Sequence, residues 1–390
     1  MIIDKLTQGA IVLGGHIQGY GIIRILGELG IPSIVIDYRK LNISHHSKYC
    51  EASYVVSYSD TIRFLLKLAS LRKYYRWVIF PTDDYYVRLL STNFGALSES
   101  FHLSVDIWDR VIKFFDKRLS YPLADATGIP IPHTFYPQSV TDLNRMLGVI
   151  PYPCIIKPAI MLDFYKAFNK KVLLCNTEVE LVSNYQFASK TIAASELMIQ
   201  EVIPGDSSNQ YSVGIFFGKD KTYNHLIARR KRQHPIDFGN ATTYAETVNI
   251  PLLLHYAEKL LAASEYTGVC EVEFKYDARD GLYKFLEVNP RLWKWHAIAK
   301  QCDVPLLESM FSYYTKGMPL QTTLYKEASW RDIVTDTKVV LELLLKKKHI
   351  SIDNKPEIQA VFNTKDILPF IMQLLYLPCF VFSKNRDCGV

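Results

Sequence analysis

The segment FLEVNPRLWKWHA, residues Phe285 to Ala297, begins as a strand but carries polar side chains where a buried strand would carry Val or Leu. Successive side chains of a strand point to opposite faces, so Glu287 and Asn289 share one face, and Arg291 is next in the same alternation. A carboxylate, an amide and a guanidinium in this order predict a site that binds charged groups.

The residues before this segment, EVEFKY at 271–276, form a second predicted strand, and DARDG at 277–281 separates the two as a hairpin turn. If the turn contains all five residues, Glu273 and Glu287 are diagonal neighbours on one face, about 7–8 Å apart at the backbone. A two-residue turn would instead move Glu273 to the opposite face. A shared site therefore requires the longer turn.

Two carboxylates and an amide oxygen are hard ligands that suit Mg²⁺ or Mn²⁺ and do not suit zinc. Burying these charges without a cation would be costly. The hairpin therefore predicts either a metal site formed by Glu273, Glu287 and Asn289, or salt bridges between glutamates and nearby basic side chains on a solvated sheet.

The composition is that of a folded protein of two or three domains, with 390 residues, of which 49% are hydrophobic and 22% charged. A net charge of +6 is compatible with an anionic substrate such as a nucleotide and too diffuse to indicate nucleic-acid binding. The seven cysteines form no CxxC pair, and the first residues lack a signal-peptide layout. We expect a reduced, cytoplasmic protein.

The first hundred residues alternate between strand and helix patterns. Strands are predicted at 10–15, 31–37, 54–57 and 77–84, with a helical pattern at 19–30 after the first strand. Strands separated by helices of this length indicate a parallel, doubly wound sheet.

The glycine-rich segment LGGHIQGYG, residues 13–21, follows the first predicted strand, and Asp37 ends the second. This layout raises the possibility of a nicotinamide-dependent oxidoreductase, but the glycines do not fit G-x-G-x-x-G with a helix opening at the right residue. The loop still offers backbone N–H groups to a substrate carboxylate or phosphate. The oxidoreductase remains an alternative.

After Asp116 the pattern changes to strands at 152–158, 195–205 and 211–218, followed by antiparallel strands up to Asn289 and helices beyond about residue 326. The apolar segment 367–382 is shorter than the roughly 20 residues of a spanning helix, and prolines interrupt it. It is either a helix packed on the domain or one that contacts a membrane surface or a partner.

Two further features have open interpretations. The basic run ARRKRQHP, residues 228–235, is either a solvated edge strand or a cluster that contacts the γ-phosphate or an acidic substrate, with Arg229 facing inward. It lacks the interleaved aromatic side chains of a nucleic-acid site. Trp293 and Trp295 either wall a substrate pocket or pack in the core.

Four segments occur in a distinctive order: DKRLSYPLADATGIPIPHT (116–134), YPCIIKP (152–158), MIQEVIPGD (198–206) and the Glu…Glu-x-Asn-x-Arg hairpin. Over about residues 1–320, this ordered set resembles the ATP-grasp superfamily of carboxylate–amine and carboxylate–thiol ligases, and within it the carbamoyl-phosphate-synthase-like members. The resemblance implies an α/β fold with four parts. They are an N-terminal doubly wound parallel-sheet domain (1–112), a small lobe or lid (113–196), a large lobe with the metal hairpin (197–325) and a helical C-terminal extension (326–390).

The resemblance also implies the roles of individual residues. Lys117 and Lys157 would contact ATP phosphates. The segment around Gln200 would bind adenine, with Glu201 accepting a hydrogen bond from the adenine amino group. Asp206 or Asn209 would bind the ribose. The acidic hairpin would hold Mg²⁺ or Mn²⁺, and Arg291 would steady the phosphorylated intermediate. The implied site residues are Lys117, Lys157, Gln200, Glu201, Ile203, Asp206, Glu273, Glu287, Asn289 and Arg291. The loop 159–171 departs from the family because it has no glycine, and Lys170 or Lys171 would substitute there.

We therefore expect an enzyme that uses ATP to convert a small-molecule carboxylate into an acyl phosphate, which an amine, or less favourably a thiol, then attacks. Catalysis would consist of positioning and charge neutralisation. The alternatives are a nucleotide-binding regulatory or scaffold protein without turnover, and the oxidoreductase.

Overall fold

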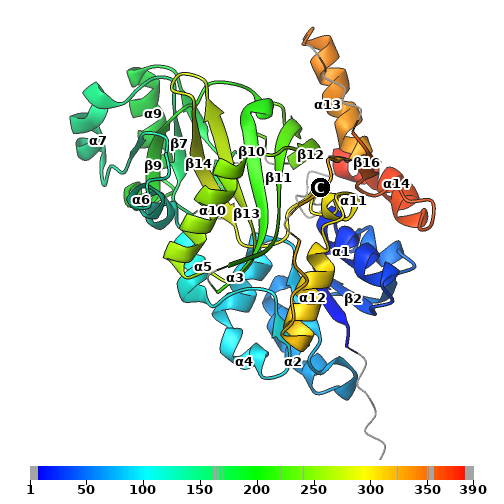
Figure 1. Cartoon of the computed structure of the whole chain (residues 1–390). Coiled ribbons are helices and arrows are strands. Elements are labelled where there is room, and N and C mark those ends of the chain that lie inside the picture. Colours follow the sequence, from blue (N-terminus) through cyan, green and yellow to red (C-terminus); the bar gives the residue numbers. More distant parts are fainter. Residues whose placement is uncertain are drawn as a thin grey trace, which may run out of the picture.

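The computed structural model describes residues 8–382 except 161–163, 165–166, 169, 220, 240, 323, 349 and 351–354. In these residues the chain forms a five-stranded, a four-stranded and a seven-stranded sheet. Figure 1 shows the four-stranded sheet beside one edge of the seven-stranded sheet, and the N-terminal part of the chain packed near the opposite end of the large sheet.

The N-terminal sheet is parallel throughout, in the order β3-β2-β1-β4-β5, as the alternating pattern predicted. Its strands are β1 (Ala10–Leu13), β2 (Ser33–Asp37), β3 (Cys50–Val55), β4 (Val78–Pro81) and β5 (His102–Leu103). The helices of this region are α1 (Ile17–Glu28), α2 (Thr61–Ala69), α3 (Asp84–Thr92), α4 (Phe94–Ser98) and α5 (Trp108–Phe115), with short 3-10 turns η1 (Ser44–His46), η2 (Tyr58–Asp60) and η3 (Arg72–Tyr74). The central strands are fully buried, as expected for a sheet covered on both faces.

The four-stranded sheet is antiparallel, in the order β6-β9-β7-β8. It contains β6 (Thr134–Phe135), β7 (Cys154–Pro158), β8 (Leu173–Cys175) and β9 (Leu197–Glu201), with helices α6 (Lys117–Ala126), α7 (Val140–Met146) and α9 (Glu178–Ala188) and turns η4 (Leu147–Val149) and η5 (Ala194–Glu196) nearby. Its β9 lies beyond the boundary that the sequence predicts at residue 197. Strand β9 thus pairs with β6 and β7, which lie on the other side of that boundary. The four-part division of the chain stays a prediction.

The seven-stranded sheet has the order β14-β13-β10-β11-β12-β15-β16 and is antiparallel except for its last pair. Its strands are β10 (Gln210–Gly218), β11 (Lys221–His234), β12 (Ala241–Thr247), β13 (Gly268–Asp277), β14 (Leu282–Asn289), β15 (Ser329–Arg331) and β16 (Glu357–Gln359), with η6 (Ser207–Asn209) before β10 and α10 (Pro251–Ser264) across one face. The last two strands come from the predicted helical extension, which is therefore mixed rather than wholly helical.

The two faces of the large sheet differ in polarity. One face buries Val213, Val272 and Phe274 in the same apolar cluster as Leu253 and Leu260 of α10. The other face is apolar only at one end, where Phe216 packs in a second cluster, and carries charged side chains at the other end. This difference between the two faces explains why the sequence of the acidic strands combines the pattern of a buried strand with polar side chains.

The C-terminal helices α11 (Ile298–Gln301), α12 (Leu306–Lys316), α13 (Ile333–Leu345) and α14 (Leu368–Phe382) complete the fold. Helix α14 packs on the N-terminal region through Phe370 and Tyr376, and the hydroxyl of Tyr376 lies 2.6 Å from Nε2 of His46. Among the described residues, none of the helices has both the length and the apolar character to span a membrane. The membrane or partner contact of segment 367–382 stays a prediction.

Gly214 in β10 is required by close packing. Its α-carbon faces the indole ring of Trp293, which is 1% exposed, and a β-carbon at position 214 would overlap that ring. We expect Gly214→Ala to lower the free energy of unfolding by about 1–3 kcal/mol, because the ring can move only by disturbing the core. Denaturant unfolding measures this change. Gly95→Ala on α4, which meets open space, is the control and should be neutral or slightly stabilising; equal effects of the two variants would contradict the packing.

Candidate active site

The acidic strands β13 and β14 are neighbours, and Glu273 lies directly opposite Glu287. The turn covers residues 278–281, because Asp277 already pairs with Leu282, so the predicted five-residue turn and diagonal register are wrong. A four-residue turn with regular pairing would place the two glutamates on opposite faces. A β-bulge, in which Leu286 is the extra residue, restores the shared face that the sequence predicted.

Two hydrogen bonds to residues outside the sheet stabilise the bulge. The hydroxyl of Tyr121 on α6 donates a hydrogen bond to the Leu286 carbonyl (2.8 Å), and the Phe285 amide donates to the carbonyl of Pro130 (2.8 Å). Both groups would otherwise have lost their partners in the ladder where the register shifts. The helix that carries Lys117 is thus attached to the strand that carries Glu287.

Lysines from three parts of the chain surround Glu287. Asp116 caps α6 by accepting from the Arg118 amide, so Lys117 is the first residue of the helix, and its Nζ lies 3.5 Å from Glu287. Burial alone would raise the pKa of the Glu287 carboxyl, but Lys117, Lys171 and Lys157 together lower it to about 2. The carboxylate is therefore ionised across the physiological pH range.

Lys157, near the end of β7, is buried and aimed into the cavity. Its ammonium donates to the hydroxyl of Tyr121 and to Oε1 of Gln200, each at 2.8 Å, and both partners are neutral. Burial, with Lys117 nearby, lowers the pKa of Lys157 well below its ordinary value. A buried ammonium without a formal counterion is suited to an anionic ligand.

The basic run on β11 faces the site through Arg230. Its Nη2 lies 3.1 Å from Oε2 of Glu273 and it lines the cavity, whereas Arg229 points to the other face and donates to the Ser208 carbonyl. The prediction that Arg229 faces the site is wrong, because the next residue, Arg230, faces it instead. The reason is the pairing of Ser212 with both Ala228 and Glu273, which gives residues 228 and 230 the face of the glutamates.

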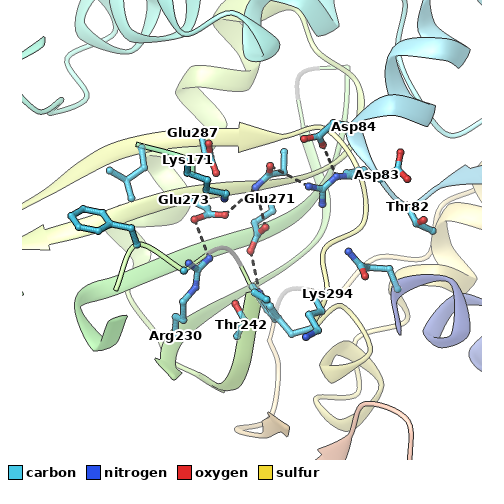
Figure 2. A pocket seen from close by; sticks show the side chains of 18 of the residues that line it. Thr82, Asp83, Asp84, Lys171, Arg230, Thr242, Glu271, Glu273, Glu287 and Lys294 are labelled. Atoms are coloured by element: carbon cyan, nitrogen blue, oxygen red, sulfur yellow. Dashed lines mark hydrogen bonds and ion pairs between the residues drawn. The ribbon is translucent and has the colours of Figure 1, made fainter. Parts of the chain in front are cut away.

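Lys171 follows the glycine-free loop and also faces the two glutamates (Figure 2). Burial, partly offset by Glu287 and Glu273, lowers the pKa of Lys171. Residues 161–163, 165–166 and 169 of this loop lie outside the described part, so how it covers phosphates stays a prediction.

The segment around Gln200 lines the cavity at the junction of the two antiparallel sheets, together with Glu201 and Ile203. The carboxylate of Glu201 accepts from the His133 amide (2.9 Å) and pairs with Arg279 (2.7 Å) and Lys284 (3.2 Å). These partners occupy both of its oxygens, so the adenine role predicted for Glu201 would fall to the backbone of the segment. Asp206 is exposed on the turn before η6 and is not among the residues that line the cavity, so its ribose role stays a prediction.

The cavity, with a volume of about 790 Å³, continues from the glutamates to the carboxyl edge of the N-terminal sheet. There Asp37, which would bind a ribose in a nicotinamide site, instead accepts from the Gly15 amide (2.6 Å) and pairs with Arg39 (3.2 Å). This engagement weighs against the oxidoreductase. Arg291 lines the same part of the cavity and pairs with Asp84 (2.7 Å), which joins the large sheet to α3.

Sequence reasoning missed Glu271 and Asp83 as site residues. Glu271 accepts from the indole N–H of Trp295 (3.1 Å) and the Asn289 amide (3.2 Å), and burial together with Glu273 raises its pKa to about 7. Asp83 lies just past β4 and caps α3 by accepting from the Tyr86 amide (2.9 Å). Its position after a buried parallel strand was the available signal, because such positions meet at the binding edge.

The residues that could hold a divalent ion are Glu273, Glu287 and Asn289. In the structure the Asn289 amide donates to Glu273 at 3.0 Å, so the three polar groups converge on one face. Over the described ranges there is no group of three or more His, Cys, Asp or Glu side chains arranged to hold a metal by themselves. A set of two carboxylates and an amide fits Mg²⁺, which takes few protein ligands when phosphates supply the rest.

Comparisons with known proteins agree with this geometry. Residues 224–322 match the family model for the carbamoyl-phosphate synthase L chain, ATP binding domain. The chain is 26% identical over 309 residues to a D-aspartate ligase of Enterococcus faecium (strain Aus0004), covering 72% of this chain and 70% of the relative.

Two solved structures show the same fold. The biotin carboxylase domain of Hydrogenobacter thermophilus 2-oxoglutarate carboxylase, solved with MgADP, ADP and bicarbonate, has a TM-score of 0.65 at 18% identity, covering 81% of this chain and 71% of that one. An L-amino acid ligase from Bacillus licheniformis has a TM-score of 0.62 at 11% identity, covering 82% and 76%.

The chain therefore has an α/β fold of the ATP-grasp type, as the sequence predicted.

Asp83 should make the free protein less stable above pH 6. Burial, with Asp84 nearby, raises its pKa from 3.8 to about 6, so the folded state penalises the charged form at higher pH. Asp83→Asn keeps the helix cap and removes the charge. We expect it to raise the free energy of unfolding by about 1–3 kcal/mol at pH 8. The gain should shrink as the pH falls below about 6, where the folded state binds the proton, and it should vanish below 3.8, where the unfolded state binds it as well.

Denaturant unfolding at pH 8 and pH 4 measures this difference. The control is Asp125→Asn, which changes an exposed carboxylate of α6 and should alter stability by less than about 0.5 kcal/mol at either pH. A destabilised Asp83→Asn variant at pH 8 would contradict the conclusion that burial penalises the charged form of Asp83.

Proposed function

We propose that this protein is a ligase that binds ATP with Mg²⁺ or Mn²⁺, transfers the γ-phosphoryl group to a small-molecule carboxylate, and joins the resulting acyl phosphate to an amine. The single observation that supports this most is the pair Glu273 and Glu287, opposite each other on one face and surrounded by lysines from separate elements. Such an arrangement suits a divalent ion beneath a triphosphate.

The nucleotide would lie between the two antiparallel sheets. The backbone of residues 200–203 would contact the adenine, and Lys157 and Lys117 would contact the phosphates, with Lys171 as a third cation. Lys157 is the strongest candidate because both of its present partners are neutral, so an anionic phosphate would supply the missing counter-charge. The charge of Lys117 is already shared with Glu287.

Glu273, Glu287 and Asn289 would hold the divalent ion, which neutralises charge on the β- and γ-phosphates when it is bound. In the described structure Arg230 pairs with Glu273 and Lys117 with Glu287, so each carboxylate is oriented by a cation without the ion. These contacts must lengthen or be shared when a metal is bound, which would bring the cations toward the phosphates.

The reaction would then proceed in two displacements. A carboxylate oxygen of the substrate attacks the γ-phosphorus, the bond from phosphorus to the ADP oxygen breaks, and an acyl phosphate forms. The amine nitrogen attacks the acyl carbon, the carbon–oxygen bond to phosphate breaks, and a proton leaves the nitrogen. Arg291, oriented by Asp84, would stabilise the charge that develops at the acyl group, and Arg230 takes the inward role expected of Arg229.

We expect Glu287→Ala and Lys157→Ala each to reduce turnover by about 10²–10³, the scale of one lost preorganised charge contact. Phosphate release from ATP in the presence of carboxylate and amine measures the loss. Exposed residues provide the controls Glu99→Ala and Lys190→Ala, which should retain full turnover.

Near-full turnover in both site variants would contradict the proposed site. A thermal-unfolding screen separates the alternatives: the ligase and a scaffold protein would both be stabilised by Mg-ATP, and an oxidoreductase by NAD(P). Only the ligase would also release phosphate when carboxylate and amine are added.

A further inference from the structure

The part of the cavity next to the N-terminal sheet contains a carboxylate, that of Asp83, which forms no ion pair among the described residues. Figure 2 shows Thr82, Asp83 and Asp84 on one side of this space, with Glu271 and Lys294 on the other sides. The aromatic rings of Tyr38, Tyr58 and Tyr85 line it as well.

The cations in this part of the cavity already have partners. Arg39 pairs with Asp37 (3.2 Å), Arg291 with Asp84 (2.7 Å), and Lys294 with Asp332 (2.9 Å). Each of these pairs is close to neutral as a unit, so they contribute little net positive charge to the space between them.

Asp83 differs from these pairs. Its carboxylate accepts from the Tyr58 hydroxyl (3.1 Å) and the Tyr86 amide (2.9 Å), both neutral donors, and among the described residues it forms no ion pair. A carboxylate with free accepting capacity that lines a cavity is incompletely compensated. Burial and the neighbouring Asp84 raise the pKa of Asp83, and they outweigh the opposite effects of the Tyr86 amide, Arg39 and Arg291.

Gln373 on α14 is a second, independent sign of a missing donor. Its side chain is 8% exposed and lines the same cavity, and its Oε1 has no hydrogen-bond partner among the described residues. Its amide nitrogen contacts Asp332 at 3.5 Å, which leaves the oxygen as the open acceptor. A buried acceptor of this kind is satisfied by a ligand that brings N–H groups.

Aromatic rings complete the environment. Tyr58 stacks between Tyr38 and Tyr85, with ring centroids 4.3 Å and 3.8 Å away, and its hydroxyl contacts Asp83. Aromatic faces beside a carboxylate favour an organic cation over a strongly hydrated metal ion. The space therefore suits an ammonium group.

We propose that Asp83 is the specificity-determining residue that binds an ammonium group on the carboxylate substrate, so that the acyl donor is an amino acid. This assignment rests on the proposed ligase function. The donor carries the ammonium because the attacking amine must be neutral when it reacts, and a carboxylate partner would stabilise its unreactive, protonated form. The donor carboxylate would then point from Asp83 toward Arg291 and the glutamates, where the phosphoryl group is transferred.

The test uses the full chain with Mg-ATP and hydroxylamine as the acceptor, so that acyl hydroxamate and phosphate report the donor alone. The donors are D- and L-aspartate, D- and L-glutamate and D- and L-alanine, each compared with its desamino analogue succinate, glutarate or propionate. We expect the wild type to prefer an amino acid over its analogue by about 10² or more in kcat/KM.

Asp83→Asn should lower kcat/KM for that amino acid by about 10²-fold, mainly through KM, and leave the desamino analogue unchanged or improved. Asp125→Asn is the matched control and should not alter the preference. The thermal shift with Mg-ATP should be the same in Asp83→Asn and wild type, which shows that the variant is folded and its nucleotide site intact.

Three results would overturn the assignment. They are equal use of amino acids and analogues by the wild type, equal losses for both in Asp83→Asn, and an effect of Asp83→Asn that appears only when an amine replaces hydroxylamine. Phosphate release from desamino acids would still support the ligase function in the first two cases. If no donor releases phosphate, the proposed function itself fails.

Discussion

The structure depends on placing Glu273 directly opposite Glu287, two like charges on adjacent strands of a buried face. Such a pair is destabilising by itself, so the surrounding elements must bring cations to it. They come from the start of α6, from the end of the loop before β8 and from β11, as Lys117, Lys171 and Arg230. The four-stranded and seven-stranded sheets are therefore positioned so that these three cations lie close to the two glutamates.

The residues that follow β14 form part of the wall at the other end of the cavity. Trp293 fills the space over Gly214, Trp295 donates to Glu271, and Arg291 reaches Asp84 on α3. Trp295 thus lines the cavity, while Trp293 serves core packing, so each of the two earlier interpretations applies to one of the rings. The same short segment connects the phosphate end of the site to the end that would hold the acyl substrate.

The alternation of side chains along a strand was enough to predict that Glu287 and Asn289 share a face, and the order of strands and helices was enough to predict the parallel N-terminal sheet. Alternation could not reveal the bulge at Leu286, because a bulge is fixed by tertiary contacts such as that from Tyr121. Without the register of β10, the face of Arg229 could not be distinguished from that of Arg230. Asp83 and Gln373 line the same cavity only through the packing of α14 on the N-terminal region, which no local pattern encodes.

The most direct measurement of the central claim is Mn²⁺ binding followed by electron paramagnetic resonance in the presence of a non-hydrolysable ATP analogue. We expect the wild type to bind Mn²⁺ together with the analogue, and replacement of both Glu273 and Glu287 by Gln to weaken this binding by more than about tenfold. Unchanged Mn²⁺ affinity in a folded double variant would contradict the claim that the bulged acidic hairpin holds the metal beneath the nucleotide.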